Sequence, residues 1–114
     1  MKKERYIMTQ KGNITHLLGE VSVERMSEFF KVMADKTRLR ILVELLDKSL
    51  CVMHISERVG MSQSATSHQL AILRKADLVR VKRSGKTVVY SISDEHVRLM
   101  LDMALLHVNE GVRE

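Results

Sequence analysis

The apolar residues in the first half of the chain recur at three- and four-residue spacing, a pattern that predicts α-helices. Residues 1–13 are charged and lack this pattern, so we interpret them as a flexible N-terminal arm. A short helical turn over 14–18 is expected to stop at Gly19, and Ser22 can cap a helix that runs to about Ala34. This helix carries an apolar stripe, expected in the core or in an interface, that consists of Met26, Phe29, Phe30 and Met33.

The following stretch predicts a scaffold helix. Asp35 is a favoured N-cap residue, and the segment KTRLRILVELLDK behind it has strong helical periodicity. We expect Arg38 and Arg40 on its outward face. Its inward face is expected to carry four leucines: Leu39, Leu42, Leu45 and Leu46.

A helix-turn-helix followed by a β-hairpin is predicted next. A short helix over about 52–59 ends at Gly60, and another begins after Ser62 and continues to about Ala76. Alternating apolar and polar residues then predict two strands over 78–82 and 87–92, joined by turn residues at 83–86. The sequence therefore predicts a mostly α-helical winged helix-turn-helix fold, with one domain over 14–112 that includes a terminal helix over 94–110.

Positive charge gathers where such a fold would meet DNA. The chain has a formal net charge of +5 at pH 7, and the span 74–86 holds six basic residues with Asp77 as its one acid. Short and amide side chains at the start of the second helix of the motif suit contacts in a major groove, although they also suit simple helix caps. The candidate DNA contacts are Gln63, Ser64, Thr66, Ser67, His68, Arg74, Lys82, Arg83 and Lys86.

The last helix carries candidate metal ligands. At about 100° per residue, His96 and His107 lie on one face, with Glu110 close to the same line, while Asp94 fits only as an N-cap residue outside helical geometry. Eleven residues separate the two histidines by roughly 16 Å, so one helix cannot close a zinc site. An antiparallel homodimer would close two symmetry-related sites, each with Asp94 and His96 from one helix and His107 and Glu110 from the other. A solvated helix face is the alternative explanation of the same residues.

Size and composition are consistent with this interpretation. The chain has 114 residues, and the modest core of so small a domain favours a partner subunit. The single cysteine, Cys51, allows no internal disulfide, and no apolar run resembles a membrane span or a signal peptide. We therefore expect a reduced, cytoplasmic protein with no membrane partner.

Four stretches give the chain a recognisable resemblance: ADKTRLRIL, LCVMHIS, SQSATSHQLAILRKADLV and a hairpin that ends VVYSIS. In this order they resemble the ArsR/SmtB family of metal-responsive bacterial repressors. The resemblance implies a dimer that binds double-stranded operator DNA without metal, is released by metal, and has no enzymatic activity. The pattern D-x-H-x10-H-x2-E of the terminal-helix sensors matches Asp94, His96, His107 and Glu110, and this donor set suits Zn(II), with Co(II) as a possible substitute. The family also suggests that His107 bonds a backbone carbonyl near Ala76 or Asp77.

Several alternatives stay open at this point. Cys51 and His54, with His16, form a second candidate metal site, whereas a buried cysteine and a surface histidine are the simpler interpretation. The regulator could instead respond to Ni(II), to oxidation of Cys51 or to a protein partner. An enzyme is disfavoured because the pair Cys51 and His54 lacks an orienting acid and the two-helix metal site leaves no position open for a substrate.

Overall fold

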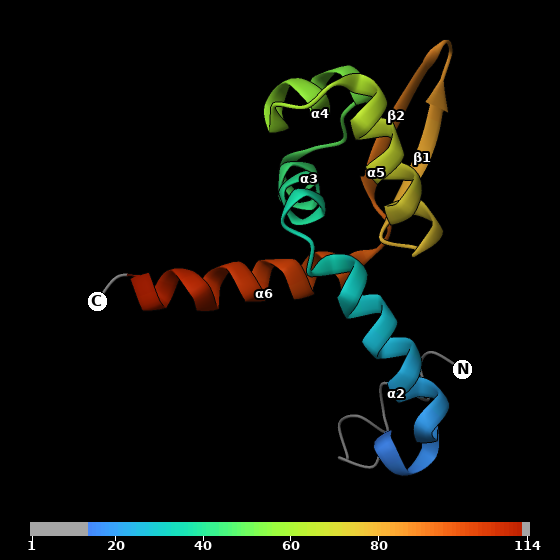
Figure 1. Cartoon of the computed structure of the whole chain (residues 1–114), viewed down its shortest axis with the longest axis vertical. Coiled ribbons are helices and arrows are strands. Elements are labelled where there is room, and N and C mark those ends of the chain that lie inside the picture. Colours follow the sequence, from blue (N-terminus) through green and yellow to red (C-terminus); the bar gives the residue numbers. More distant parts are fainter. Residues whose placement is uncertain (1–13, 113–114) are drawn as a thin grey trace. The chain divides into compact units, whose positions relative to one another are not determined.

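The computed structural model describes the backbone of residues 14–112 and the side chains of 22–111. The arm predicted over 1–13 lies outside the described residues. The described residues fall into two compact units that divide between Lys31 and Val32, and the single domain predicted over 14–112 stays a prediction. The described elements, labelled in Figure 1, are α2 (Ile14–Met33), α3 (Lys36–Asp47), α4 (Val52–Val59), α5 (Gln63–Lys75), β1 (Val79–Ser84), β2 (Thr87–Ile92) and α6 (Glu95–Val112).

Helix α2 is continuous through Gly19, so the break predicted there is wrong. A glycine inside a helix costs only about 1 kcal/mol relative to alanine, which the rest of a 20-residue helix can absorb. The apolar stripe is mostly uncovered within this chain: Met26 and Phe30 are exposed, and only Met33 is buried. Met33 thus belongs to the core, whereas an interface for the exposed part of the stripe stays a prediction.

The core of the second unit joins α3, α4, α5 and the hairpin. Its fully buried aliphatic side chains come from all four parts of the sequence and are Ile41, Leu42, Leu45, Ile55, Leu70, Leu73, Leu78 and Val79. Two details of α3 differ from the prediction, because the buried face is centred on Ile41. Leu39 is 37% exposed, and Leu46 is half-buried. Arg38 turns inward, where Nε donates to Oε1 of Gln69 at 2.9 Å.

Capping signals predicted the starts of α3 and α5 correctly, whereas the cap predicted at Ser22 is wrong, because α2 begins at Ile14 and runs through Ser22. Oδ2 of Asp35 accepts a hydrogen bond from the amide of Arg38 at 3.1 Å, and Oγ of Ser62 accepts one from the amide of Ala65 at 3.1 Å. Gly60 ends α4 with φ at 73°, a left-handed conformation that glycine adopts without steric cost. The predicted helix-turn-helix over α4 and α5 is confirmed.

The β-hairpin is confirmed as well, with a tighter turn than predicted. β1 and β2 pair antiparallel from Val79↔Ile92 to Ser84↔Thr87, so Ser84 belongs to the strand and the turn shrinks to Gly85 and Lys86. Leu50 extends the pairing by a two-way backbone bridge to Tyr90, with N–O distances of 3.0 and 2.8 Å. This bridge fixes the hairpin against the start of α4, and α5 runs beside the hairpin (Figure 1).

Helix α6 is anchored at its start only. Val97 and Leu101 are buried, whereas every described residue from Asp102 to Gly111 is exposed. Figure 1 shows this helix, in red, leaving the α3–β2 region and extending away from it. The fold of the second unit is a winged helix-turn-helix with a protruding terminal helix. No helix in the described part of the chain has the length and apolar character needed to cross a membrane.

Candidate nucleic-acid interface and metal-ligating helix

Helix α5 presents a polar outer face. Leu70 and Leu73 anchor its inner face in the core, and the Ser62 cap fixes the orientation of its first turn. Residues at three- and four-residue spacing therefore point outward, and these exposed residues include Gln63, Ser64, Ser67, His68 and Arg74. They form a continuous strip of hydrogen-bonding groups on an exposed helix.

Thr66 does not belong to this strip, and its prediction as a DNA contact is corrected. Its side chain is 0% exposed, and its Oγ1 donates to the carbonyl of Ser62 at 2.8 Å. Its hydroxyl is buried and its hydrogen bond is made inside the helix, so it is not available to contact DNA. Thr66 lies four residues before Leu70 and seven before Leu73, so helical spacing in the sequence could have placed it on the inner face.

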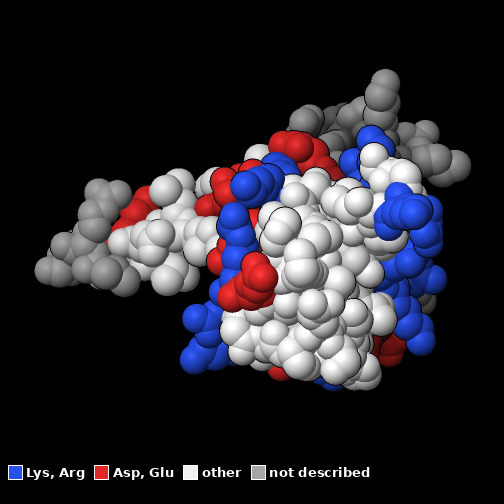
Figure 2. Space-filling view, turned by 90° about the horizontal axis from the view of Figure 1, so that it is seen from above, with Lys and Arg blue, Asp and Glu red and all other residues white. Residues whose placement is uncertain are grey.

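The hairpin adds basic side chains beside the helix. Arg80, Lys82, Arg83 and Lys86 are all exposed, the last of them at the tip. Figure 2 shows Lys and Arg side chains gathered at the edges of the molecule around a central face with few charges. Long basic side chains on a protruding hairpin are suited to phosphate contacts.

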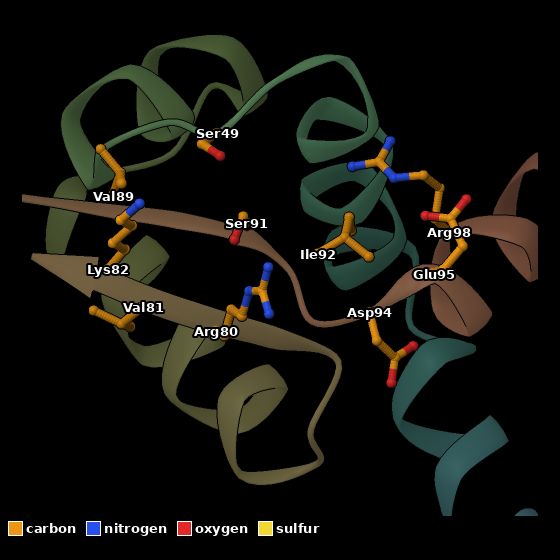
Figure 3. A pocket seen from close by; sticks show the side chains of 10 residues that line it. All are labelled: Ser49, Arg80, Val81, Lys82, Val89, Ser91, Ile92, Asp94, Glu95 and Arg98. Atoms are coloured by element: carbon orange, nitrogen blue, oxygen red, sulfur yellow. The ribbon is translucent and has the colours of Figure 1, made fainter. Parts of the chain in front are cut away.

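A groove separates the hairpin from the start of α6. It has a volume of about 670 Å³, and Figure 3 shows basic side chains of β1 and acidic side chains from the start of α6 along it. Its lining residues of both charges are Arg80, Lys82, Asp94, Glu95 and Arg98. The groove therefore brings the candidate phosphate contacts of the hairpin close to one of the candidate metal ligands.

Asp94 occupies the N-cap of α6, as the metal interpretation requires. Its Oδ1 accepts a hydrogen bond from the amide of Val97 at 3.0 Å, and the same atom lies 3.6 Å from Nδ1 of His96. An N-cap residue has a non-helical backbone, which lets the Asp94 carboxylate approach the His96 imidazole. In regular helical geometry, the side chain of residue 94 would point away from that of His96. One carboxylate and one imidazole come together at the start of the helix.

His107 and Glu110 lie near the other end of α6, and both are exposed. In the part of the chain that the structure describes, no three His, Cys, Asp or Glu side chains gather around one point. The four candidate ligands therefore lie as two pairs at opposite ends of α6. Between them, apolar side chains point to solvent, with Leu99 48% and Met103 61% exposed.

Two of the three candidate ligands of the second metal site, Cys51 and His54, lie next to each other. Sγ of Cys51, the residue before α4, lies 3.6 Å from Nδ1 of His54 in the first turn of that helix. The side chain of His16 is outside the described residues. A thiol and an imidazole are thus adjacent, without a third ligand of the described chain beside them.

Two contacts that sequence analysis missed connect α6 to the rest of its unit. Oγ of Ser93 donates to the carbonyl of Asp77 at 2.7 Å, and Nη1 of Arg98 donates to the carbonyl of Leu46 at 2.7 Å. Both join residues far apart in the chain, and a backbone carbonyl carries no mark in the sequence, so no pattern could have revealed them.

Comparison with known proteins decides the family. Residues 35–81 match the model of the bacterial regulatory proteins of the arsR family. The chain is similar to the transcriptional repressor SmtB homolog of Synechocystis, with 40% identity over 88 residues that cover 77% of this chain and 67% of that protein. The chain belongs to the ArsR family.

Solved structures extend this assignment to the three-dimensional fold. The antimony-specific transcriptional repressor AntR superposes with a TM-score of 0.75 at 33% identity, covering 86% of this chain and 89% of that one. The homodimeric winged helix-turn-helix DNA-binding domain Mb0332 of Mycobacterium bovis gives a TM-score of 0.76 at 24% identity, covering 84% and 94%, and so shows the same fold. As an ArsR-family member, the chain is a DNA-binding transcriptional repressor and not an enzyme.

Proposed function

We propose that this repressor senses Zn(II), with Co(II) as a possible substitute, and that its metal-free homodimer binds operator DNA and is released by the metal. The observation that carries the proposal is the contact of Asp94 with His96, at 3.6 Å, on a helix whose other end presents His107 and Glu110 to solvent. Each pair is a half-site that lacks two ligands, which a second copy of α6 would supply.

An antiparallel pair of α6 helices completes both half-sites at once. Pairing Asp94 with Glu110 centres the two-fold axis at about residue 102, and pairing His96 with His107 centres it at about 101.5, so one register serves both. The exposed Leu99 and Met103 lie near this centre, where apolar side chains would be buried by the partner. The pairing therefore covers the apolar surface that a single chain leaves in water.

The donor set fits a borderline divalent ion. Two imidazole nitrogens and two carboxylate oxygens, with no thiolate, suit tetrahedral Zn(II) and disfavour soft ions such as Cu(I). When bound, Zn(II) would supply a cross-link between the two helices. The protein's own contribution is the N-cap at Asp94, which holds the carboxylate near His96 before any metal arrives.

The DNA side of the proposal uses the outer face of α5 and the hairpin. Gln63, Ser64, Ser67 and His68 would contact base edges or phosphates in a major groove, and Arg74 lies farther along the same face. Lys82, Arg83 and Lys86 would contact phosphates and fix the register. A metal cross-link between the two α6 helices would hold the two α5 helices of the dimer at a separation that no longer fits successive major grooves.

We propose that His107 is coupled to the end of α5, because a ligating histidine usually donates its second imidazole nitrogen to an acceptor. The acceptor would be a backbone carbonyl near Ala76 or Asp77. The Asp77 carbonyl already accepts from Ser93, but a carbonyl oxygen has two lone pairs, so a second donor can be accommodated.

The deciding experiment is a titration of the metal-free dimer against its operator. The operator is first selected from DNA upstream of the protein's own gene, and binding is followed by fluorescence anisotropy at fixed salt. Zn(II), Co(II), Ni(II) and Cd(II) are then added in parallel, and Zn(II) is expected to weaken DNA binding by about 5- to 150-fold. A DNA complex that no metal weakens would refute the proposal. Weakening by Ni(II) alone would mean that the protein senses Ni(II), at a site with more than four ligands, and not Zn(II).

A further inference from the structure

The carbonyl of Asp77 marks the end of the helix that we propose contacts DNA. Helix α5 is capped at Ala76, and Asp77 then adopts a left-handed backbone with φ at 63°. The amide of Leu78 donates back to the carbonyl of Leu73 at 2.9 Å, which closes the helix end. The carbonyl of Asp77 is thereby set at a fixed position relative to α5.

Ser93, directly after the end of β2, donates a hydrogen bond to this carbonyl. Ser93 is 8% exposed and makes two hydrogen bonds to successive carbonyls of the α5–β1 connection. Its amide donates to Leu78 at 3.0 Å, and its Oγ donates to Asp77 at 2.7 Å. Ser93 is buried while Asp77 is exposed, so the two bonds attach the connection to the core at the Ser93 end.

The residue after Ser93 is Asp94, the candidate metal ligand. From the Asp77 carbonyl to the Asp94 carboxylate, the path therefore consists of one hydrogen bond and one step along the chain. Arg98, one turn into α6, fixes the same helix start to the carbonyl of Leu46 at 2.7 Å. The start of α6 is thus attached to the ends of both α5 and α3.

We infer that Ser93 is a positioning residue for metal-dependent release: its hydroxyl transmits the position of Asp94 to the end of α5 within one subunit. This inference rests on the proposed function. If Asp94 moves when its carboxylate binds a metal ion, the bond from Ser93 to Asp77 would move the end of α5 with it. Without this bond, the segment between α5 and β1 could stay in place while Asp94 moves. Such a connection gives allosteric coupling a physical basis, because it provides an element whose position both sites can bias.

The test separates coupling from binding in the full-length dimer. Operator affinity is measured with and without saturating Zn(II), and Zn(II) affinity is measured by competition with a chromophoric chelator. For Ser93→Ala, both the metal-free operator affinity and the Zn(II) affinity are expected within about threefold of the original protein, while the zinc-dependent weakening of DNA binding falls at least about fivefold. Ser93→Thr, which restores a hydroxyl on the same carbon, should regain most of the coupling.

Ser91→Ala is the matched control, because it removes a hydroxyl two residues earlier on the same segment and should keep full coupling. Should S93A fail to fold, Ser93→Cys, which keeps the size and weakens the donor, takes its place under the same criteria. Unchanged coupling in the variant, or equal loss in the Ser91 control, overturns the role of Ser93. If the original protein itself shows no response to any metal, the proposed function fails and this inference fails with it.

Discussion

A single carboxylate oxygen, Oδ1 of Asp94, lies 3.0 Å from the amide of Val97 and 3.6 Å from Nδ1 of His96. Asp94 therefore combines a structural role as helix cap with its proposed role as metal ligand. The two roles can be separated by substitution, because asparagine caps helices as well as aspartate does but is a much poorer ligand for Zn(II).

We expect Asp94→Asn to keep the thermal stability of the protein and to weaken Zn(II) binding by at least about tenfold, a loss in the range of known outer-shell and ligand effects. Asp94→Ala should lose the cap as well, at a cost of about 1 kcal/mol in the free energy of unfolding. Chelator competition measures the first effect and denaturant unfolding the second. Equal Zn(II) affinity in D94N and the original protein would remove Asp94 from the ligand set.

His107→Asn tests the far half-site. This exposed side chain has no role in the core of its own chain, so we expect operator binding without metal to stay within about threefold of the original protein and metal-dependent release to disappear. Fluorescence anisotropy with and without Zn(II) measures both. Joint loss of DNA binding and release would contradict the assignment, because it would place His107 in the structure of the DNA-binding surface.

The apolar face of α6 predicts the dimer interface. Replacement of Met103, which is 61% exposed in the single chain, by glutamate would bury an unpaired charge at the proposed two-fold axis. We expect M103E to sediment as a monomer at micromolar concentration and to lose tight Zn(II) binding. Asp102→Asn, on an exposed neighbouring position, is the control and should remain dimeric. A dimeric M103E protein would place the interface elsewhere.

The basic hairpin predicts the salt dependence of DNA binding. Removal of one side chain that touches a phosphate should lower the slope of log affinity against log salt by about one. We therefore expect Lys82→Ala and Lys86→Ala each to reduce this slope by about one per subunit, with little change in sequence preference. Lys36→Ala, in the first turn of α3, should leave the slope unchanged. An unaltered slope in the hairpin variants would exclude these lysines from the DNA interface.

Cys51 and His54 require their own test, since their side chains are adjacent. The proposed sensor site contains no thiolate, so Cys51→Ser is expected to bind as many Zn(II) ions per dimer as the original protein and to release DNA at the same metal concentration. Equilibrium dialysis counts the ions. A lower stoichiometry would instead establish a second site, and a loss of response to oxidants would indicate a redox signal.

Local signals were reliable at three helix ends and wrong at Ser22, which lies inside α2. Asp35, Gly60 and Ser62 act on backbone groups within four residues of themselves, so their effects could be predicted without knowing the fold. The candidate ligand Asp94 was likewise placed at a helix cap by the periodicity of the helix behind it.

Predictions that depended on the surroundings were less successful. Whether Arg38 points outward or toward Gln69 depends on how helices pack against one another. Thr66, by contrast, shares the helical spacing of Leu70 and Leu73 and could have been placed on the inner face. The bond between Ser93 and Asp77 joins residues 16 positions apart and became visible only once β1 and β2 were paired. Gly19 shows the opposite error, because a residue that weakens a helix was interpreted as one that ends it.

If α6 forms the proposed intersubunit metal sites, its protruding part makes the response to metal depend on the concentration of the protein. Beyond Leu101, its described residues gain no support from the core of their own unit, so association with a second chain would have to stabilise them. At low protein concentration the dimer would dissociate, and the four-ligand sites between its subunits would be lost. A cell that makes more of this repressor would thereby raise both the number of sites and the affinity of each, and the metal threshold for gene expression would shift with repressor abundance.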